Sequence, residues 1–221
     1  MESDRLEAFS DGVFAVAITL LALNLAVSGP EDKAFSLAHK LGSHWPFFAA
    51  YAVSFLTIGI IWVNHHTLFK NFAKIDRTLL FLNLLLLFFV VCIPFGTSNF
   101  AAYLSGGHFD AKLATAIYQG IFEGMSLSFG ILFWWAIRHE HLKIALTPAA
   151  ARTAVIRFGI GNVGYIAAVG IAFVSPAASL AISALVAIYY IFEQTPARSS
   201  VPAAPDDPGN PADPGDPAAT S

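Results

Sequence analysis

Six long apolar stretches restrict the fold of this chain more than any other feature of its sequence. They cover approximately Ala8–Val27, Trp45–Phe69, Thr78–Leu104, Leu113–Ile137, Ala154–Val174 and Pro176–Phe192. Most are close to the ~20 residues that a helix needs to cross a bilayer. A lone spanning segment must satisfy its backbone polar groups internally, and the alternating pattern of a membrane barrel is absent. We therefore predict an all-α membrane protein with six transmembrane helices.

Composition supports lipid as the solvent. Hydrophobic residues make up 56% of the chain and charged residues only 12%, against about 25% charged residues in soluble domains. The single cysteine, Cys92, excludes a disulfide framework. Outside the C-terminal tail the charges are nearly balanced, so we expect no nucleic-acid partner. Within the third stretch, Pro94 predicts a kink or an early helix end.

The basic residues fall mostly on one side of the predicted spans, which sets their orientation. Three occupy the other side, at Lys33, Lys40 and Lys112. The remaining nine lie at Arg5, Lys70, Lys74, Arg77, Arg138, Lys143, Arg152, Arg157 and Arg198. Both termini are therefore predicted to be cytoplasmic.

The chain divides into two parts by composition. Residues 1–194 hold the six predicted helices and form one transmembrane domain. Residues 195–221 are rich in Pro, Ala, Asp and Gly. Such a segment has too few apolar residues to build a core, so we predict a disordered cytoplasmic tail.

The start of the first span carries the most unusual motif, with Arg5, Phe9, Ser10 and Asp11 leading directly into the apolar run. Acidic groups in a first helical turn favour the positive end of the helix dipole, which is one explanation. Ionisable groups at membrane depth are otherwise functional or anchoring residues, which is the second explanation. Arg5 and Asp11 are six residues apart, about 240° around a helix, so each would need a partner elsewhere.

One narrow stripe of the same helix combines small residues, aliphatic residues and one hydroxyl. It contains Gly12, Val16, Thr19, Leu23 and Ala26. Small residues with threonine are common where membrane helices pack together. The same stripe could line a pore, where threonine replaces part of an ion's hydration and aliphatic rings exclude water. Helical spacing alone leaves both interpretations open.

Polar residues in the later spans are candidates for other chemistry. Trp62 and His66 share a face of the second span, and Asn83 of the third could reach them. Glu123 lies inside the fourth span, where a carboxylate could relay protons or be a packing residue. The adjacent histidines at 65 and 66 lack the spacing of a zinc helix, and no nucleophile or cofactor motif is present. We therefore expect no enzyme activity, no cofactor and no permanently bound metal.

Arg5, Phe9, Ser10 and Asp11 match the R-x-x-x-F-S-D signature of the transmembrane protein 175 family of potassium channels, best known from lysosomes. The resemblance covers about residues 4–194, which is similar to one repeat of that family. Animal channels contain two repeats, whereas this single repeat resembles the prokaryotic branch, whose members assemble as homotetramers.

The resemblance implies a central pore lined by four copies of the first helix. It places Val16 at a hydrophobic constriction, Thr19 one turn further, with transient potassium near it, and Leu23 at the next apolar ring. It also implies that the signature's charged residues fasten the first helix to its neighbours, with Trp62, His66 and Asn83 as the matching partners. Val16 stands where larger aliphatic residues are common in the family.

The expected function is therefore a cation channel that prefers potassium and acts by passive permeation in a prokaryotic plasma membrane, with the bilayer, potassium and its own copies as partners. A proton channel or proton-coupled transporter that uses Glu123 and His66 is the alternative. Duplicated segments with paired broken helices, which many transporters use, are not found.

Overall fold

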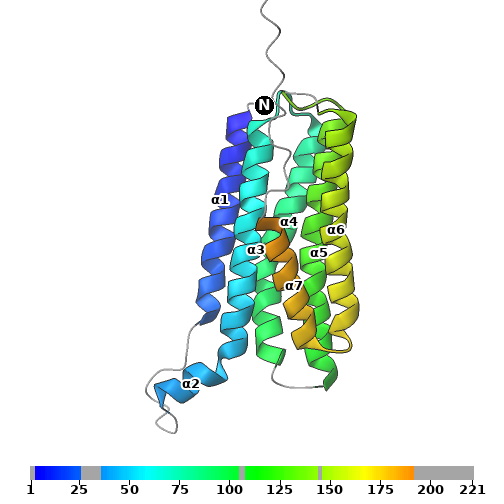
Figure 1. The fold of residues 1–221 in the computed structure, drawn as a ribbon. Coiled ribbons are helices and arrows are strands. Elements are labelled where there is room, and N and C mark those ends of the chain that lie inside the picture. Colours follow the sequence, from blue (N-terminus) through cyan, green and yellow to red (C-terminus); the bar gives the residue numbers. More distant parts are fainter. Residues whose placement is uncertain (1–2, 26–35, 105–107, 144–145, 192–221) are drawn as a thin grey trace, which may run out of the picture.

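The computed structural model describes residues 3–25, 36–104, 108–143 and 146–191, and within these ranges it contains helices and turns but no strand. Two loops in this part of the chain meet at one isolated β-bridge, between Phe72 and Leu142. The helices are α1 (Ser3–Ala22), the 3₁₀ turn η1 (Leu23–Leu25), α2 (Leu37–Ser43), α3 (Trp45–Lys70), α4 (Arg77–Leu104), α5 (His108–Arg138), α6 (Pro148–Ala172) and α7 (Pro176–Ile191) (Figure 1).

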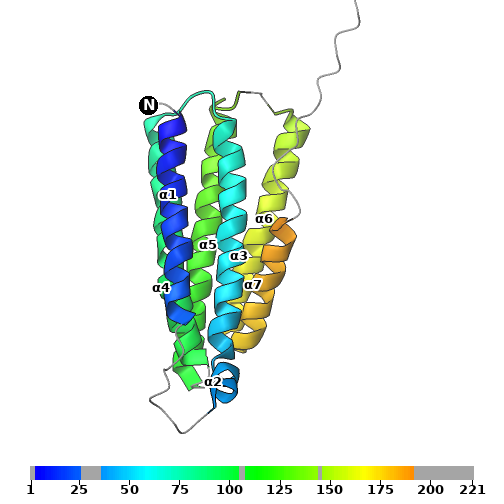
Figure 2. The ribbon, with the colours of Figure 1, turned by 90° about the vertical axis from the view of Figure 1, so that its left-hand side faces the viewer.

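The long helices form an upright bundle in which chain neighbours pack together. Helix α1 contacts α3 and α4, whereas α5 contacts α4, α6 and α7. Figure 2 shows α1 on the outside of the bundle, in front of α4 and to one side of α3. Helix α7 packs on α3, α5 and α6, and it is shorter than these three helices (Figure 1). One long face of α1 is therefore left without a partner in the subunit.

Aromatic rings fill the centre of the bundle. Phe100 stacks on Tyr118 with ring centroids 4.9 Å apart, and Tyr118 contacts Phe122 at 4.6 Å. Phe122 in turn meets Tyr165 edge-on at 5.7 Å. These four side chains are buried and come from α4, α5 and α6. Tilted and edge-on pairs are favourable geometries for aromatic contacts. The row of four rings therefore stabilises the packing of these three helices.

A buried chain of hydroxyl groups joins α3, α4 and α5. Ser54 Oγ lies 2.8 Å from Thr97 Oγ1 and 2.9 Å from the hydroxyl of Tyr118. Thr97 donates its own proton to the carbonyl of Ile93. Ser54 must therefore donate to Thr97 and accept from Tyr118, so that every hydroxyl proton in the chain has an acceptor. Hydroxyl bonds of this kind hold membrane helices together at a fixed height.

Side-chain amides fasten α5 to the last two helices. Gln119 donates to the backbone carbonyl of Ser179 at 3.2 Å and accepts a bond from Ser183 at 2.5 Å. About two helical turns further along α5, Ser126 donates to Asn162 of α6. These bonds are inside the helix bundle, where they satisfy polar groups that water cannot reach.

The described loop residues 71–76 and 139–143 lie at the same end of the bundle as the start of α1 (Figure 1). Besides the β-bridge, Ala73 N–H donates to the carbonyl of His141 at 2.7 Å, and Asp76 Oδ2 lies 3.2 Å from His141 Nε2. Partial burial opposes ionisation of Asp76, but hydrogen bonds from the backbone of Leu79 and the indole of Trp135, together with His141, outweigh it. The pKa of Asp76 is therefore lowered from its ordinary value.

In the part of the chain that the structure describes, four helices, α3 to α6, are long and apolar enough to cross a membrane. Helix α1 falls outside this group because Arg5, Glu7 and Asp11 interrupt its apolar run, and α7 because it has 16 residues. The predicted all-helical membrane fold is confirmed at this level. The count of six spans, the cytoplasmic termini and the tetramer stay predictions.

The helix boundaries differ from the apolar stretches mainly at their polar ends. Helix α1 begins at Ser3, five residues before the predicted Ala8, and α6 begins at Pro148 rather than Ala154. Helix α4 continues through Pro94 to Leu104, so the early end considered there is wrong. Pro is tolerated within membrane helices because neighbouring groups satisfy the freed carbonyl. The predicted tail, residues 195–221, lies outside the described residues.

Candidate functional site

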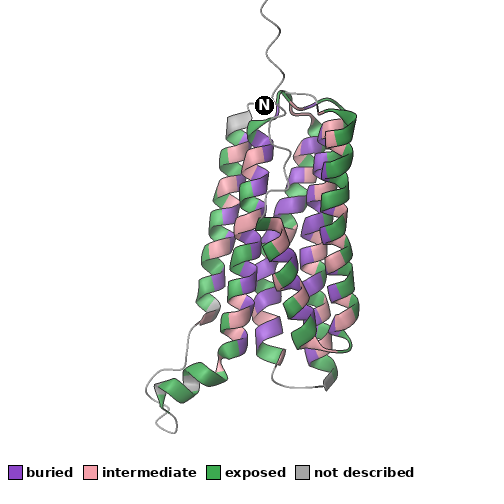
Figure 3. Ribbon diagram, in the orientation of Figure 1, coloured by how far each residue is buried: buried purple, intermediate pink, exposed green. Residues whose placement is uncertain are grey.

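Helix α1 has one face buried in its own subunit and one face turned away from it (Figure 3). Leu6, Phe14, Ala17 and Leu21 are buried on the first face and belong to the hydrophobic core. The second face carries the predicted stripe, and the structure exposes each of its described members, Gly12, Val16, Thr19 and Leu23. Ala26, the fifth residue of the predicted stripe, lies outside the described residues.

The exposed face carries a hydroxyl between two aliphatic residues. Val16 is 56% exposed and Leu23 is 72% exposed, although both are apolar. Thr19 lies between them, one helical turn from each, and donates its hydroxyl proton to the carbonyl of Val16 at 2.9 Å. Because the proton is used within the helix, the oxygen's lone pairs remain available to accept from water or to coordinate a cation.

A buried chain of polar groups fastens α1 to α3 and α4. Ser10 is buried and donates to the carbonyl of Leu6 at 2.9 Å. Asn83 of α4 donates to Ser10 Oγ at 3.0 Å, and its carbonyl oxygen lies 2.8 Å from His65 Nε2 of α3. Since an amide oxygen only accepts, His65 carries its proton on Nε2 and donates it. Ser10, Asn83 and His65 therefore form one continuous hydrogen-bonded link across three helices.

A second set of contacts lies nearer the surface, between α1 and α3. Trp62 Nε1–H donates to Asp11 Oδ1 at 2.8 Å. His66 Nδ1 lies 2.8 Å from Glu7 Oε1 and 3.9 Å from Asp11 Oδ2. The rings of Trp62 and His66 stack, with centroids 5.7 Å apart. The motif's aspartate thus reaches the predicted tryptophan and histidine.

The other two residues of the motif are placed differently. Arg5 is exposed and joins neither set of contacts among the described residues, and Phe9 is 53% exposed. The structure therefore brings together Ser10, Asp11, Trp62, His66 and Asn83, but not the arginine or the phenylalanine within the subunit.

Two participants were missed by the sequence interpretation. His65 does not share the face of Trp62 and His66 on the predicted second span, and it reaches Asn83 instead. Glu7 is one of the acidic residues in the first turns of the helix, and it contacts His66. The available signal was helical spacing, because Glu7 lies four residues before Asp11 and so shares its face.

Glu123 and His66, which the alternative function pairs, lie in different parts of the bundle. His66 contacts α1, whereas Glu123 on α5 is close enough to interact electrostatically with Tyr165 of α6 and Tyr190 of α7. Both carboxylate oxygens of Glu123 are shielded and have no hydrogen-bond partner among the described residues. The structure gives no contact that joins Glu123 to His66 in a relay.

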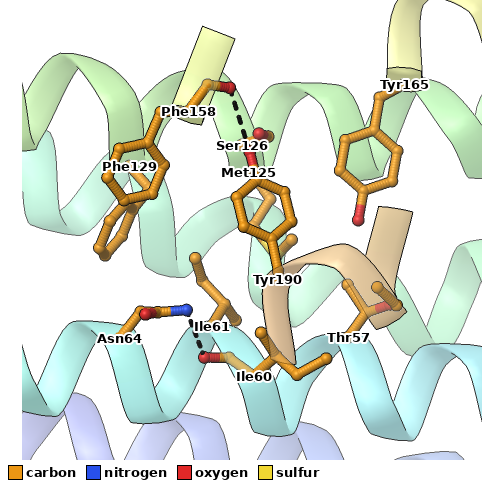
Figure 4. A pocket seen from close by; sticks show the side chains of 11 residues that line it. Thr57, Ile60, Ile61, Asn64, Met125, Ser126, Phe129, Phe158, Tyr165 and Tyr190 are labelled. Atoms are coloured by element: carbon orange, nitrogen blue, oxygen red, sulfur yellow. Dashed lines mark hydrogen bonds between the residues drawn. The ribbon is translucent and has the colours of Figure 1, made fainter. Parts of the chain in front are cut away.

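A small cavity with several polar groups in its walls lies between α3, α5, α6 and α7 (Figure 4). Its volume is about 20 Å³, which is room for about one water molecule. Thr57, Asn64, Ser126 and Tyr190 line it, and Tyr190 donates to the carbonyl of Phe158. A cavity of this size can hold a structural water but no organic ligand.

The chain is similar to known proteins over most of its length. The family model described as endosomal/lysosomal potassium channel TMEM175 matches residues 5–94. A potassium channel of Streptomyces collinus is 48% identical over 196 residues, which are 88% of this chain and 94% of that protein. A potassium channel of Chamaesiphon minutus is 38% identical over 86% of this chain and 93% of its own.

One mammalian relative and one solved structure extend the comparison. The mouse endosomal/lysosomal proton channel TMEM175 is 34% identical over 67% of this chain, which corresponds to 31% of the mouse protein. The crystal structure of a lysosomal potassium-selective channel TMEM175 homolog from Chamaesiphon minutus superposes with a TM-score of 0.76 at 34% identity. It covers 88% of this chain and 99% of that one. The chain therefore belongs to the TMEM175 family of ion channels.

Proposed function

We propose that the chain is a potassium-conducting channel of a prokaryotic plasma membrane, in which four copies place the exposed face of α1 around a common axis. The observation that carries this proposal is the position of Thr19, a hydroxyl on a face that the subunit leaves uncovered, between exposed Val16 and Leu23. The bacterial relatives named as potassium channels support the choice of ion.

The proposed topology has six spans, formed by α1 and α3 to α7, with both termini in the cytoplasm. The side chains of Glu7 and Asp11 support a span for α1 although they are charged, because each contacts a polar group of α3. Such pairing lowers the free energy of placing a charge near a membrane edge. The loops that carry Lys74 and Lys143 lie beside the N-terminus (Figure 1), which supports one basic, cytoplasmic end.

Permeation in this arrangement needs no catalytic residue. Four Thr19 oxygens around the axis would replace part of the hydration shell of a passing potassium ion, since each has lone pairs free after donating its proton within the helix. The rings of Val16 and Leu23 on either side would be narrow and apolar. Apolar constrictions exclude water when they close, so they are the proposed barriers to ion flow.

Ion flux into proteoliposomes tests the function. We expect potassium uptake to exceed sodium uptake, and equal or absent flux of both ions would contradict the proposal. Thr19→Val removes the hydroxyl at nearly the same volume and should reduce the ratio of potassium to sodium flux. Thr67→Val is the matched control, because the Thr67 hydroxyl of α3 likewise donates to its own helix, at the carbonyl of Val63.

Cysteine accessibility tests the position of α1. In a Cys92→Ala background, Thr19→Cys should react with a water-soluble thiol reagent and the modified channel should lose potassium flux. A cysteine placed at buried Ala17 should stay unmodified. An unreactive residue 19 in a protein that still conducts would remove Thr19 from the pore.

Proton permeation is the second candidate, because the mouse relative is named a proton channel. Glu123 is its residue of interest, since its carboxylate is shielded and unpartnered among the described residues. A pH-sensitive dye inside the same vesicles measures proton entry. Proton entry that disappears in Glu123→Gln, while potassium flux persists, would establish a separate proton path.

A further inference from the structure

Three metal-ligating side chains converge between α1 and α3, outside the proposed ion path. Glu7, Asp11 and His66 each offer one ligand atom, and these atoms lie within 4.8 Å of one another. Glu7 and Asp11 are four residues apart on α1 and share a face, and His66 approaches both from α3. The set combines an imidazole nitrogen with two carboxylate oxygens.

The separations fit a zinc-type coordination shell. Bonds of 2.0–2.2 Å to nitrogen and oxygen in a tetrahedral shell place two ligand atoms about 3.3–3.5 Å apart. The distances from His66 Nδ1 are 2.8 Å to Glu7 Oε1 and 3.9 Å to Asp11 Oδ2, on either side of that value. Small side-chain rotations would equalise them without moving either helix.

The surroundings of these atoms support the ligand geometry. Trp62 donates to Asp11 Oδ1, which orients the carboxylate and leaves Oδ2 facing His66. The indole of Trp62 also stacks on the His66 ring at an interplanar angle of 26°. Outer contacts that fix ligand orientation in this way are a regular part of metal sites.

The exposure of the three ligands and their net charge also suit a divalent metal ion. All three ligands are half-buried, so an ion can enter from water and keep a water molecule as its fourth ligand. Two carboxylates neutralise a divalent cation. The imidazole favours zinc and similar transition metals over calcium and magnesium, which prefer shells made only of oxygen.

We propose that Glu7, Asp11 and His66 bind one divalent transition-metal ion of the zinc type per chain and thereby cross-link α1 to α3. This site is distinct from the transient potassium position near Thr19. Under the proposed function, the cross-link joins the pore-lining helix to its neighbour, and only this consequence rests on that function.

Zinc binding to the full chain in detergent, measured by competition with a chromophoric chelator, tests the site directly and requires no channel activity. We expect one zinc ion per chain and no competition from a similar concentration of calcium. His66→Gln and Glu7→Gln should weaken binding by at least about tenfold, and Trp62→Phe by about 10- to 100-fold. His44→Gln, at the other end of α3, is the control and should bind as the wild type does.

A second measurement separates loss of the site from loss of the fold. Zinc should raise the unfolding temperature of the wild type and of His44→Gln, but not that of a folded His66→Gln protein. No zinc binding by the wild type, unchanged affinity in His66→Gln, or an unchanged unfolding temperature at zinc saturation would each overturn the proposal.

Discussion

Replacing Asn83 by alanine should destabilise the protein by about 2–4 kcal/mol. Asn83 is fully buried and bonds both to Ser10 and to His65. Without its oxygen, the buried Nε2–H of His65 has no acceptor, which costs about 1–3 kcal/mol. The lost bond to Ser10 adds about 0.6 kcal/mol, the average for hydrogen bonds between membrane helices. The orphaned histidine therefore dominates the effect.

Reversible unfolding in mixed micelles, followed by circular dichroism, measures this difference. Asn99→Ala is the matched control, because Asn99 lies on the same helix and donates to a carbonyl of that helix, at Phe95. We expect the control to stay within about 0.5 kcal/mol of the wild type. A double-mutant cycle of Asn83→Ala with Ser10→Ala should give a coupling of about 0.6 kcal/mol and no more than ~1.7. Equal stability of the two asparagine variants would refute the reasoning.

Three further substitutions test other contacts by the same unfolding assay. Gly124→Ala should destabilise the protein, because its Cβ would clash with the ring of Phe89 on α4. Gly120→Ala, whose Cβ would have nothing within 4 Å, should be neutral or stabilising by up to about 1 kcal/mol. The reverse order would contradict this packing. Ser54→Ala should lower the free energy of unfolding more than Tyr118→Phe, because only the loss of Ser54 leaves a buried hydroxyl proton, that of Tyr118, without an acceptor. Equal losses of stability would contradict the assignment of Tyr118 as donor to Ser54. Asp76 has a lowered pKa in the folded state, so its contribution is present above the unfolded value of about 3.9 and is lost as the pH falls. Asp76→Asn should therefore lower the unfolding temperature at pH 7 and change it less at pH 3, and a pH-independent difference would exclude this linkage.

Much of the fold could be predicted from the sequence because lipid imposes a simple rule on apolar segments. Each long apolar stretch had to become a helix. The C-terminal ends of α3, α4 and α5 lie within one residue of the predicted ends. The beginning of α1 could not be found in this way, because Glu7 and Asp11 are polar. Their contacts with α3 allow the helix to include them, and such contacts depend on tertiary structure.

The candidate site was only partly predictable for a similar reason. Helical spacing correctly placed Trp62 and His66 on one face, but whether Thr19 faced the subunit or away from it depended on how α1 packs. The same spacing places His65 on a different face from Trp62, but only the packing of α4 shows that Asn83 accepts its hydrogen bond. The continuation of α4 through Pro94 likewise depends on neighbouring helices rather than on local sequence.

The polar links of the bundle also determine how it can move. Helices α3 and α4 are joined at two heights, by Asn83 with His65 and by Ser54 with Thr97. The described polar links of α1 to other helices all lie near its N-terminus, at Glu7, Ser10 and Asp11. Sliding α3 against α4 would break both of their links, whereas swinging the far half of α1 breaks none of its own. As far as these polar links are concerned, α1 is therefore freest to pivot about its polar end, against the apolar packing of Phe14, Ala17 and Leu21. A rotation of a few degrees there moves Leu23 much further than Gly12.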